Sequence, residues 1–492
     1  MMALCSTLVV AATAAGASYD LLIVGGGSAG LTAAKFAARF GKSVALIEKA
    51  RMGGDCTWTG CVPSKALIAS ASRAHAARTA GEFGVTVDSA VSVDMAAIKA
   101  RLGRTIGKIY DADDSPEALK ALGIDTISGA ATLVDAHSIR VDGGQGDAAV
   151  YRAGKGIVVA TGARPRLPKI DGIESVGYLT YEDVFELSEL PARLTVIGGG
   201  PIGCELAQAF ARLGSKVTLV ARELLPGHEP EAAADLKSSL TADGVRLVAS
   251  RASSVSAAGG GHELKCDDGS TVEGTTLLAA TGRVPVVDGL GLADAGVTLG
   301  SNGGIQVDAK LRTSLKGVYA AGDCTGDQQF THYAGFQGAI AARNVLLPLS
   351  DPGVLGSSVP ACVFTAPEIA RIGLTEAQAR AAGGSVAVAF RPMSEVDRAI
   401  TMGEEALGFI KIVYNPKGGV ILGATVMGPS AGELVSEIAV AMAGKVKLPA
   451  LASIMHAYPT VSIAIQQMAA EVYYNQLEAS MPLYNVLSKI GL

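Results

Sequence analysis

Short apolar runs alternate with stretches of helical periodicity through the first part of the chain. Tyr19–Val24 is such a run. A glycine-rich turn follows it, Leu31–Phe40 has helical periodicity and ends at Gly41, and Ser43–Glu48 is the next apolar run. Continuous apolar runs of this length are typical of strands buried on both faces of a parallel sheet. The stretch therefore predicts a strand–helix–strand unit.

The same pattern recurs in the middle of the chain. Leu194–Ile197 predicts a strand, Glu205–Leu213 a helix that Gly214 ends, and Lys216–Val220 the next strand. The two units are too far apart for a short-period repeat array, so they predict two nucleotide-binding domains. Beyond residue 350, the pattern of apolar and polar residues changes and predicts several strands followed by helices. This arrangement is typical of an α+β domain. The expected elements there are strands at 363–364, 408–413 and 420–426 and helices at 432–443 and 462–475.

Composition and charge exclude several classes of partner. The net charge is −5 and the sequence has no Lys/Arg run, so neither nucleic acid nor an anionic membrane is expected as a partner. The 7 cysteines are odd in number and mostly scattered, which argues against a secreted disulfide framework. Residues 1–18 form a small apolar leader that is too short to span a bilayer and lacks a basic start. We expect it to be disordered or a targeting remnant, which leaves the location open between cytoplasm and organelle.

The first glycine turn has the pattern of a dinucleotide-binding site. Gly25 allows a tight turn, Gly27 lets a pyrophosphate approach the backbone, and Gly30 lets the helix pack closely on the strand. The helix N-terminus then faces the negative charge of the phosphates. Glu48, at the end of the second strand, can accept hydrogen bonds from a ribose diol.

The second glycine turn, with Gly198, Gly200 and Gly203, differs at the end of its second strand. Ala221-Arg222 stands where an acid would bind the ribose hydroxyl of NAD. Because a guanidinium suits a 2′-phosphate, NADPH is favoured over NADH, and His228 would help when protonated. The alternative is that Arg222 is a solvated surface residue.

Cys56 and Cys61 are the only cysteines that lie close together in the sequence. Residues five apart on a regular helix are too distant and too misaligned for a disulfide, so the segment must be a loop or a distorted first turn. Gly60 and Pro63 permit such a distortion. A helix N-terminus beside Cys61 would favour its thiolate. A plain stabilising disulfide is the alternative.

The motif around the two cysteines resembles that of class I pyridine nucleotide-disulfide oxidoreductases, a family that includes dihydrolipoyl dehydrogenase and mercuric reductase. The resemblance runs from about Tyr19 to Asn475. The matching signatures are Gly53-Gly54-x-Cys56-x-x-x-Gly60-Cys61-Val62-Pro63-Ser64-Lys65, Val159-Ala160-Thr161-Gly162, Ala280-Thr281-Gly282-Arg283, Ala321-Gly322-Asp323, Phe364-Thr365-x-Pro367-Glu368 and Gly373-Leu374-Thr375-Glu376.

The resemblance implies an α/β fold with two Rossmann-like domains, for FAD and NAD(P), and a C-terminal α+β dimerisation domain that forms a homodimer. The FAD domain would comprise 19–160 and 285–350, the NAD(P) domain 161–284 and the dimerisation domain 351–492. Asp323 would hold the ribityl chain of FAD. The residues Thr161, Gly162 and Gly282 belong to the matching cofactor-binding signatures.

The resemblance also implies catalytic roles. Cys61 would contact the flavin and form a charge-transfer complex, and Cys56 would exchange with the acceptor. Lys65 would lie near flavin N5, where its charge stabilises the reduced flavin, and Glu205 would orient it. Trp58, between the cysteines, is expected to pack beside the flavin.

The C-terminal motif favours a mercuric reductase-like enzyme. Disulfide reductases of this family have a His base and a Glu that orients it, but here Tyr458 and Ile463 hold these positions. A phenol with a pKa of about 10 is a poor base at neutral pH, yet it can donate a hydrogen bond or contact a metal–thiolate. His456 lies two residues before Tyr458, so it would replace the base only if its loop had a different orientation.

The expected function is therefore electron transfer from NADPH through FAD to the dithiol and on to Hg(II) or a similar acceptor. No structural metal is expected, and Cys56 and Cys61 are candidates for transient Hg(II) ligands. The sequence lacks both the N-terminal Cys-x-x-Cys domain and the C-terminal cysteine pair of mercuric reductase. A dihydrolipoyl dehydrogenase-type or other disulfide reductase is the alternative, and a redox-sensing flavoprotein without turnover is a hypothesis of another class.

The Arg222→Glu substitution tests the cofactor assignment. We expect the efficiency with NADPH to fall by about ten- to a hundredfold, because hydrogen bonds to charged groups contribute roughly 1.5–3 kcal/mol. The efficiency with NADH should change far less. Steady-state kinetics with both cofactors, with Lys216→Glu at the other end of the same predicted strand as control, gives the comparison. A wild type that prefers NADH contradicts the assignment.

Overall fold

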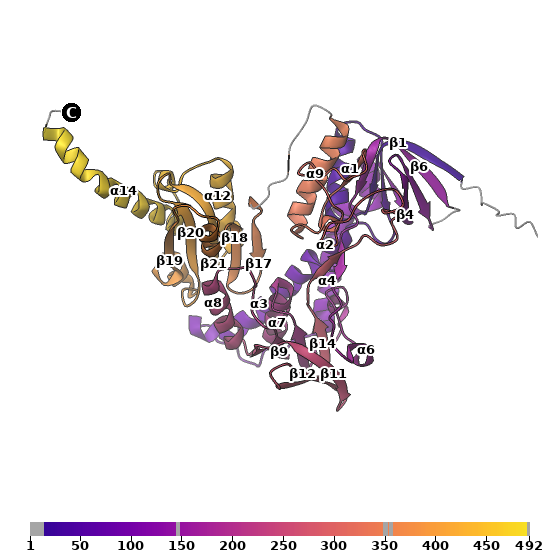
Figure 1. Cartoon of the computed structure of the whole chain (residues 1–492). Helices are drawn as coiled ribbons and strands as arrows, with labels where there is room; N and C mark the ends of the chain where they lie inside the picture. The colour runs from indigo at the N-terminus through magenta and orange to yellow at the C-terminus, as the bar shows by residue number, and fades with distance from the viewer. Residues whose placement is uncertain (1–13, 144–147, 348–352, 354–357, 490–492) are drawn as a thin grey trace, which may run out of the picture. The chain divides into compact units, whose positions relative to one another are not determined.

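The structure is a computed structural model that describes residues 14–143, 148–347, 353 and 358–489. The described residues form two compact units (Figure 1). Unit 1 contains those of Met1–Ala66, Lys99–Arg166 and Gly282–Val354, and unit 2 contains those of Leu67–Ile98, Leu167–Thr281 and Leu355–Leu492.

Unit 1 is built on a 7-stranded sheet with the order β3-β2-β1-β6-β5-β4, in which β16 also pairs with β6. Strands β1, β2, β3, β6 and β16 are parallel, and β4 and β5 are antiparallel. The strands are β1 Ala14–Val24, β2 Val44–Glu48, β3 Ile124–Ser128, β4 Ala130–Asp135, β5 Ser138–Asp142, β6 Ala149–Val159 and β16 Val318–Ala320. The predicted parallel strand–helix–strand unit is confirmed, and β16 brings a late segment of the chain back to the same sheet.

Strand β1 begins earlier than expected, and this corrects part of the predicted leader. Ala14 pairs with Ala149 and Ser18 with Arg152, so 14–18 continue the strand instead of forming a separate segment. Tyr151 packs on Gly16. Residues 1–13 lie outside the described ranges.

Helices α1 (Ser28–Arg39) and α9 (Thr331–Leu346) pack side by side against the sheet (Figure 1). A Cβ on Gly338 would lie 2.0 Å from the carbonyl oxygen of Ala29, so only glycine permits this approach. The core between helices and sheet is aliphatic and contains Leu21, Ile23 and Leu46. Helices α2 Gly54–Trp58 and α5 Pro116–Ala121 also belong to unit 1, whereas α3 Cys61–Thr79 and α4 Met95–Ile109 each belong partly to unit 1 and partly to unit 2.

Unit 2 contains the second predicted strand–helix–strand unit. Its 4-stranded parallel sheet has the order β10-β9-β8-β14. Its elements are β8 Arg193–Ile197, α7 Pro201–Leu213, β9 Lys216–Val220, α8 Pro230–Ala242, β10 Arg246–Val248 and β14 Thr276–Ala279. A 3-stranded antiparallel sheet follows β10 and comprises β11 Ala252–Ala258, β12 Gly261–Cys266 and β13 Thr271–Gly274.

Unit 2 also contains the predicted C-terminal α+β domain. Its 5-stranded antiparallel sheet has the order β17-β18-β21-β20-β19. The elements are β17 Ala361–Val363, β18 Glu368–Gly373, α10 Glu376–Ala381, β19 Ala387–Pro392, α11 Asp397–Met402, β20 Phe409–Asn415, β21 Val420–Gly428, α12 Ala431–Ala443, α13 Leu448–Leu451 and α14 Ile463–Lys489. Helix α14 is longer than predicted and projects away from this sheet (Figure 1). Within the described ranges, no helix combines the length and the hydropathy that a membrane crossing needs.

Lys411 of β20 lies in the interior of unit 2 among three carboxylates. Its Nζ is 3.0 Å from Glu229, 2.7 Å from Glu231 and 2.9 Å from Glu376. Burial by itself would lower the pKa of Lys411, but the hydrogen bonds to the carboxylates raise it. The charged cluster therefore links the start of α8 to the antiparallel sheet.

The Lys411→Met substitution should destabilise unit 2 strongly. Removing one partner of a buried ion pair costs about 3–5 kcal/mol because the other charge stays buried without compensation. Urea unfolding followed by circular dichroism measures the loss, and Lys417→Met, at an exposed position, is the control. Equal midpoints for the two variants would show that the cluster does not stabilise the fold.

Candidate functional site

The first glycine turn has the geometry that a dinucleotide needs. Gly25 has a φ of +107°, and a Cβ there would lie 2.2 Å from the carbonyl oxygen of Ala160. A Cβ on Gly30 would lie 1.8 Å from the carbonyl oxygen of Gly25, so helix and strand touch at this point. At Gly27, the nearest atom to a Cβ is the Cα of Gly54 at 3.9 Å. The turn thus keeps open space beside Gly27, at the N-terminus of α1, which fits the pyrophosphate of FAD.

Glu48 is held at the mouth of this turn. Its carboxylate accepts hydrogen bonds from the backbone N–H groups of Gly26 and Ala50, both at 2.7 Å. A carboxylate has about four lone-pair sites, so capacity remains for a ribose diol. The residue therefore fits its predicted role toward FAD.

The second glycine turn repeats the geometry in unit 2. Gly198 has a φ of +120°, and a Cβ on Gly203 would lie 1.9 Å from the carbonyl oxygen of Gly198. A Cβ on Gly200 would meet no atom within 4 Å. The turn fits a second dinucleotide, which is NAD(P) if the first is FAD.

The two predicted 2′-phosphate ligands differ in their surroundings. Arg222 follows β9 and is exposed. Burial and the charge of Arg371 lower the pKa of His228, and its Nδ1 lies 3.2 Å from the carbonyl oxygen of Leu225. Since the neutral ring is favoured, the structure argues against the predicted contribution of a protonated His228. Arg222 remains the candidate.

Cys56 and Cys61 do not share one regular helix, in agreement with the prediction, but they lie on two helices and not in a loop or a distorted first turn. Helix α2 contains Cys56, and Cys61 is the first residue of α3. Between them, a Cβ on Gly60 would lie 2.8 Å from the carbonyl oxygen of Asp55, so the chain turns tightly there. Both side chains are reduced thiols, Cys61 is exposed, and its Sγ lies 3.1 Å from the hydroxyl of Thr331. The structure thus describes the reduced pair.

The thiol of Cys56 is held in its protonated form. A hydrogen bond with Cys61, burial and the charge of Cys61 raise the pKa of Cys56 well above its ordinary value. Thr331 opposes this shift and Asp114 adds to it. Other cysteines are inert for a different reason: burial raises the pKa of Cys204 to about 12 and that of Cys324 to about 11. Both are fully buried packing residues.

A charge bridge that the sequence analysis did not identify joins the cysteine loop to the FAD signature. The guanidinium of Arg283 lies 2.7 Å from Asp55 and 2.9 Å from Asp323. Burial raises the pKa of Asp323, Arg283 opposes that shift, and Asp55 adds to it. In the sequence, Asp55 stands directly before Cys56 and Arg283 directly after Gly282. Nothing in the sequence indicated that these two side chains form an ion pair.

The three remaining predicted cofactor residues lie together. Strands β7 (Ala163–Pro165) and β15 (Arg283–Pro285) pair directly after Thr161-Gly162 and Gly282. The hydroxyl of Thr161 donates to the carbonyl oxygen of Val286 at 2.7 Å. Gly162 and Gly282 both have positive φ, +73° and +113°. Glycine adopts this backbone conformation readily at the two turns that lead into β7 and β15.

Lys65 and Glu205 belong to different units, and their pairing stays a prediction. Lys65 follows Cys61 by one turn of α3 in unit 1. Glu205 is buried on α7 of unit 2, where its carboxylate accepts a hydrogen bond from the backbone N–H of Phe364 at 2.9 Å.

Tyr458 and His456 both lie in unit 2 and have different partners. Tyr458 is 66% exposed, and its hydroxyl donates to Asp397 at 3.1 Å. Nδ1 of His456 lies 2.8 Å from the carbonyl oxygen of Ile454, and Nε2 lies 2.7 Å from Glu437. Although burial opposes it, these contacts raise the pKa of His456. Neither ring nitrogen of His456 is available to a substrate in this arrangement.

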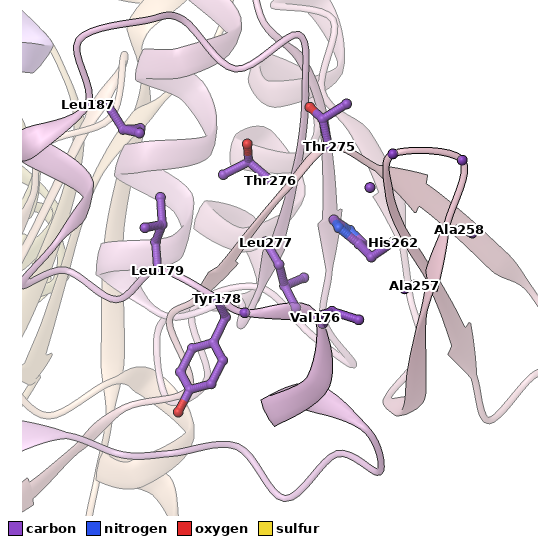
Figure 2. Close-up of a pocket in the computed structure, with 14 residues that line it drawn as sticks. Val176, Tyr178, Leu179, Leu187, Ala257, Ala258, His262, Thr275, Thr276 and Leu277 are labelled. Atoms are coloured by element: carbon purple, nitrogen blue, oxygen red, sulfur yellow. The ribbon is translucent and has the colours of Figure 1, made fainter.

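A separate cavity of about 680 Å³ opens in unit 2 (Figure 2). The hairpin that carries Ala257, Ala258 and His262 lies on one side of it and Leu179 on the other. His262 faces Thr195, with Nε2 2.9 Å from that hydroxyl, and burial lowers the pKa of His262. The described residues that line the cavity include none of the predicted site residues.

Comparison with known proteins agrees with this arrangement. The profile of the pyridine nucleotide-disulphide oxidoreductases matches residues 19–338, and that of their dimerisation domain matches 359–469. Mercuric reductase from Lysinibacillus sphaericus is 35% identical over 426 residues, which are 85% of this chain and 76% of that protein. Dihydrolipoyl dehydrogenase 2 from Haloarcula marismortui is 33% identical over 469 residues, which are 92% of this chain and 96% of that protein.

A solved structure extends the comparison. The Cu(II) complex of the HOCl-induced flavoprotein disulfide reductase RclA from Escherichia coli superposes with a TM-score of 0.82 at 28% identity. The match covers 92% of this chain and 99% of that one.

Arg283→Met should weaken the retention of FAD. Without the guanidinium, the ion pairs that join Asp55 and Asp323 beside the turn that fits the pyrophosphate are lost. Since hydrogen bonds to charged groups contribute roughly 1.5–3 kcal/mol, the dissociation constant of FAD should rise about ten- to a hundredfold. Fluorescence titration of the apoprotein with FAD measures it. Arg164→Met is the matched control, because Arg164 makes an exposed pair with Asp288 in the same unit. Equal affinities in both variants would exclude this role.

Proposed function

The chain belongs to the pyridine nucleotide-disulphide oxidoreductases, which are FAD-dependent enzymes, and we propose that it passes electrons from NADPH to the Cys56–Cys61 pair and on to a thiol-bound metal ion such as Hg(II). The family membership also indicates a homodimer through the dimerisation domain. Relatives named as reductases and dehydrogenases favour turnover over a purely sensing role.

The residues of unit 1 support the first half of this cycle. FAD, when bound, supplies the relay between the nicotinamide and the thiols. The first glycine turn and Glu48 provide the binding features for FAD, and Asp323 with Arg283 supplies charge beside them. Reduction breaks the bond between the two sulfur atoms. One sulfur takes a proton and the other retains the electron pair, and the raised pKa of Cys56 favours the proton on that residue.

The hydrogen bond from Tyr458 to Asp397 is the observation that most supports a metal-ion acceptor. This contact raises the pKa of Tyr458, so the phenol stays protonated and cannot take a proton from a dithiol near neutral pH. Ile463 stands at the position of the orienting Glu and accepts no hydrogen bond. Both ring nitrogens of His456 are engaged. An acceptor whose thiolate ligands are exchanged without proton transfer fits these residues best.

A thiophilic metal ion is such an acceptor. Soft thiolates bind soft metal ions, so the reduced pair offers two suitable ligands for a transient complex with Hg(II). The similarity to mercuric reductases supports this choice, and the copper complex of RclA recommends Cu(II) as a second ion to assay. Arg222 supports NADPH as the donor, since the position after β9 holds a guanidinium and no acid.

A disulfide reductase of the dihydrolipoyl dehydrogenase type is the second candidate. One observation favours it: His456 and Glu437 form a His–carboxylate pair with a separation of 2.7 Å. Such a pair would serve as a base only after Nε2 leaves Glu437 or Nδ1 leaves Ile454. The relative from Haloarcula marismortui, which matches 92% of this chain, supports the same alternative.

A side-by-side assay of the purified holoenzyme with Hg(II) in excess thiol and with dihydrolipoamide separates the two functions. We expect NADPH-dependent Hg(II) reduction and slow turnover of dihydrolipoamide. Tyr458→Phe should lower the mercury activity, because the hydroxyl is lost. Tyr458→His combined with Ile463→Glu should raise disulfide exchange by up to about a hundred- to ten-thousand-fold, the usual contribution of a positioned base.

Glu437→Gln is the discriminating variant. It should leave Hg(II) reduction unchanged if His456 is structural, and it should depress dihydrolipoamide oxidation if His456 is the base. Tyr178→Phe, outside the predicted site, controls for the loss of a phenol. Brisk dihydrolipoamide oxidation by the wild type that Glu437→Gln abolishes would reverse the ranking of the two functions.

A further inference from the structure

The last helix of the chain continues beyond the domain on which it packs. Near the start of α14 (Ile463–Lys489), Ile465 and Val472 belong to the hydrophobic core of the C-terminal domain. Arg391 of β19 forms an ion pair with Glu471 of the same helix. From there the helix continues to its end and projects away from the antiparallel sheet (Figure 1). At a rise of 1.5 Å per residue, the projecting part is roughly 25 Å long.

The projecting part begins with large apolar side chains that face solvent. Tyr474 is 59% exposed, Leu477 38% and Met481 45%. None of the residues 473–481, all of which the structure describes, is buried. The three side chains follow one another at spacings of three and four residues, so they lie on one face of the helix. These three residues are called the exposed stripe below.

The exposed stripe has the properties of a surface that packs against another helix. An isolated helix of a few turns is marginal in water, because most helices in proteins are stabilised by the packing of an apolar face. Apolar residues at alternating spacings of three and four are typical of a helix that pairs with a second helix. Tyrosine and methionine are also enriched at protein interfaces. We therefore expect a partner surface for the exposed stripe.

Two features indicate a second copy of this chain as the partner. The profile of the family's dimerisation domain matches 359–469, so α14 begins inside the matched domain and the exposed stripe follows directly from it. From Val472 to Met481, the sequence has one charged residue, Glu478, and no Lys or Arg. A helix that lies on an anionic membrane has Lys or Arg on its polar face. A nearly uncharged stripe can instead meet a second copy without repulsion between like charges.

We propose that the exposed stripe of α14 packs against a helix of a second copy of this chain, so that the dimer interface extends beyond the matched dimerisation domain. This inference goes beyond the proposed function, since it concerns assembly and does not depend on the electron acceptor. In a dimer with two-fold symmetry, both stripes are buried at once, so one substitution changes the interface at two places.

Leu477→Glu and Ala479→Glu form a matched pair of variants. Both add one carboxylate at an exposed position of α14, but Ala479 lies on the face opposite the exposed stripe. Sedimentation equilibrium of the FAD-loaded, full-length protein over a dilution series measures the dissociation constant of the dimer. Leu477→Glu should raise it by about tenfold or more, because a carboxylate buried without a partner is costly. Ala479→Glu should leave it at the wild-type value, and circular dichroism shows whether both variants fold.

A photo-reactive p-benzoylphenylalanine at position 477 identifies the partner directly. Ordinary and isotope-labelled chains are mixed and allowed to exchange subunits before illumination, and mass spectrometry then identifies the cross-linked peptides. Cross-links from position 477 that join an ordinary chain to a labelled chain support the proposal. The same group at position 479 is the control and should give far fewer of these cross-links.

Three results would overturn the proposal. Cross-links from position 477 that stay within one chain would show that the exposed stripe packs on its own chain. Equal dissociation constants for the wild type and Leu477→Glu would exclude the stripe from the dimer interface. Binding of the wild type, but not of Leu477→Glu, to phosphatidylcholine–phosphatidylglycerol vesicles without a change in dimerisation would assign the stripe to a membrane surface. If Leu477→Glu does not fold, Leu477→Ser takes its place and the cross-links decide.

Discussion

The close approach of two backbone turns is the constraint on which the rest of the site depends. Gly54 has a φ of +58°, and a Cβ there would lie 2.7 Å from the Cα of Gly27. The segment that carries Cys56 therefore starts directly on the glycine turn that fits the pyrophosphate of FAD. Because a side chain on Gly54 would collide with the backbone of Gly27, only glycine at position 54 permits this approach of the cysteine loop to the cofactor turn.

Charge is arranged around this backbone contact in two ways. Arg283 compensates Asp55 and Asp323 on the side of the cofactor signature. Asp114, on the side of the turn between the cysteines, has a hydroxyl as its hydrogen-bond donor and lies in the interior. A compensated pair contributes mainly orientation, whereas a buried single charge changes the protonation of its neighbours. The first arrangement thus lies at the cofactor signature, and the second lies at the turn between the cysteines.

The proposed choice of acceptor rests on residues of the C-terminal domain. Tyr458 is exposed and remains protonated beside Asp397, and His456 is occupied by Glu437 and a backbone carbonyl. Both features deprive a dithiol substrate of a base near neutral pH. The buried cluster around Lys411 links this domain to the segment that follows β9, so two parts of unit 2 share one ionic core.

The sequence by itself determined the two glycine turns, the two strand–helix–strand units, the absence of a regular helix from Cys56 to Cys61 and the α/β class, because each follows from local sterics and short-range periodicity. It placed the start of β1 five residues late, since pairing with β6 and not local propensity extends the strand to Ala14. It could not predict that Asp114 reaches Thr57, that Arg283 reaches Asp55, or that burial disfavours a charged His228. Those contacts join residues far apart in the chain, and only tertiary packing sets the distances and the desolvation that decide charge.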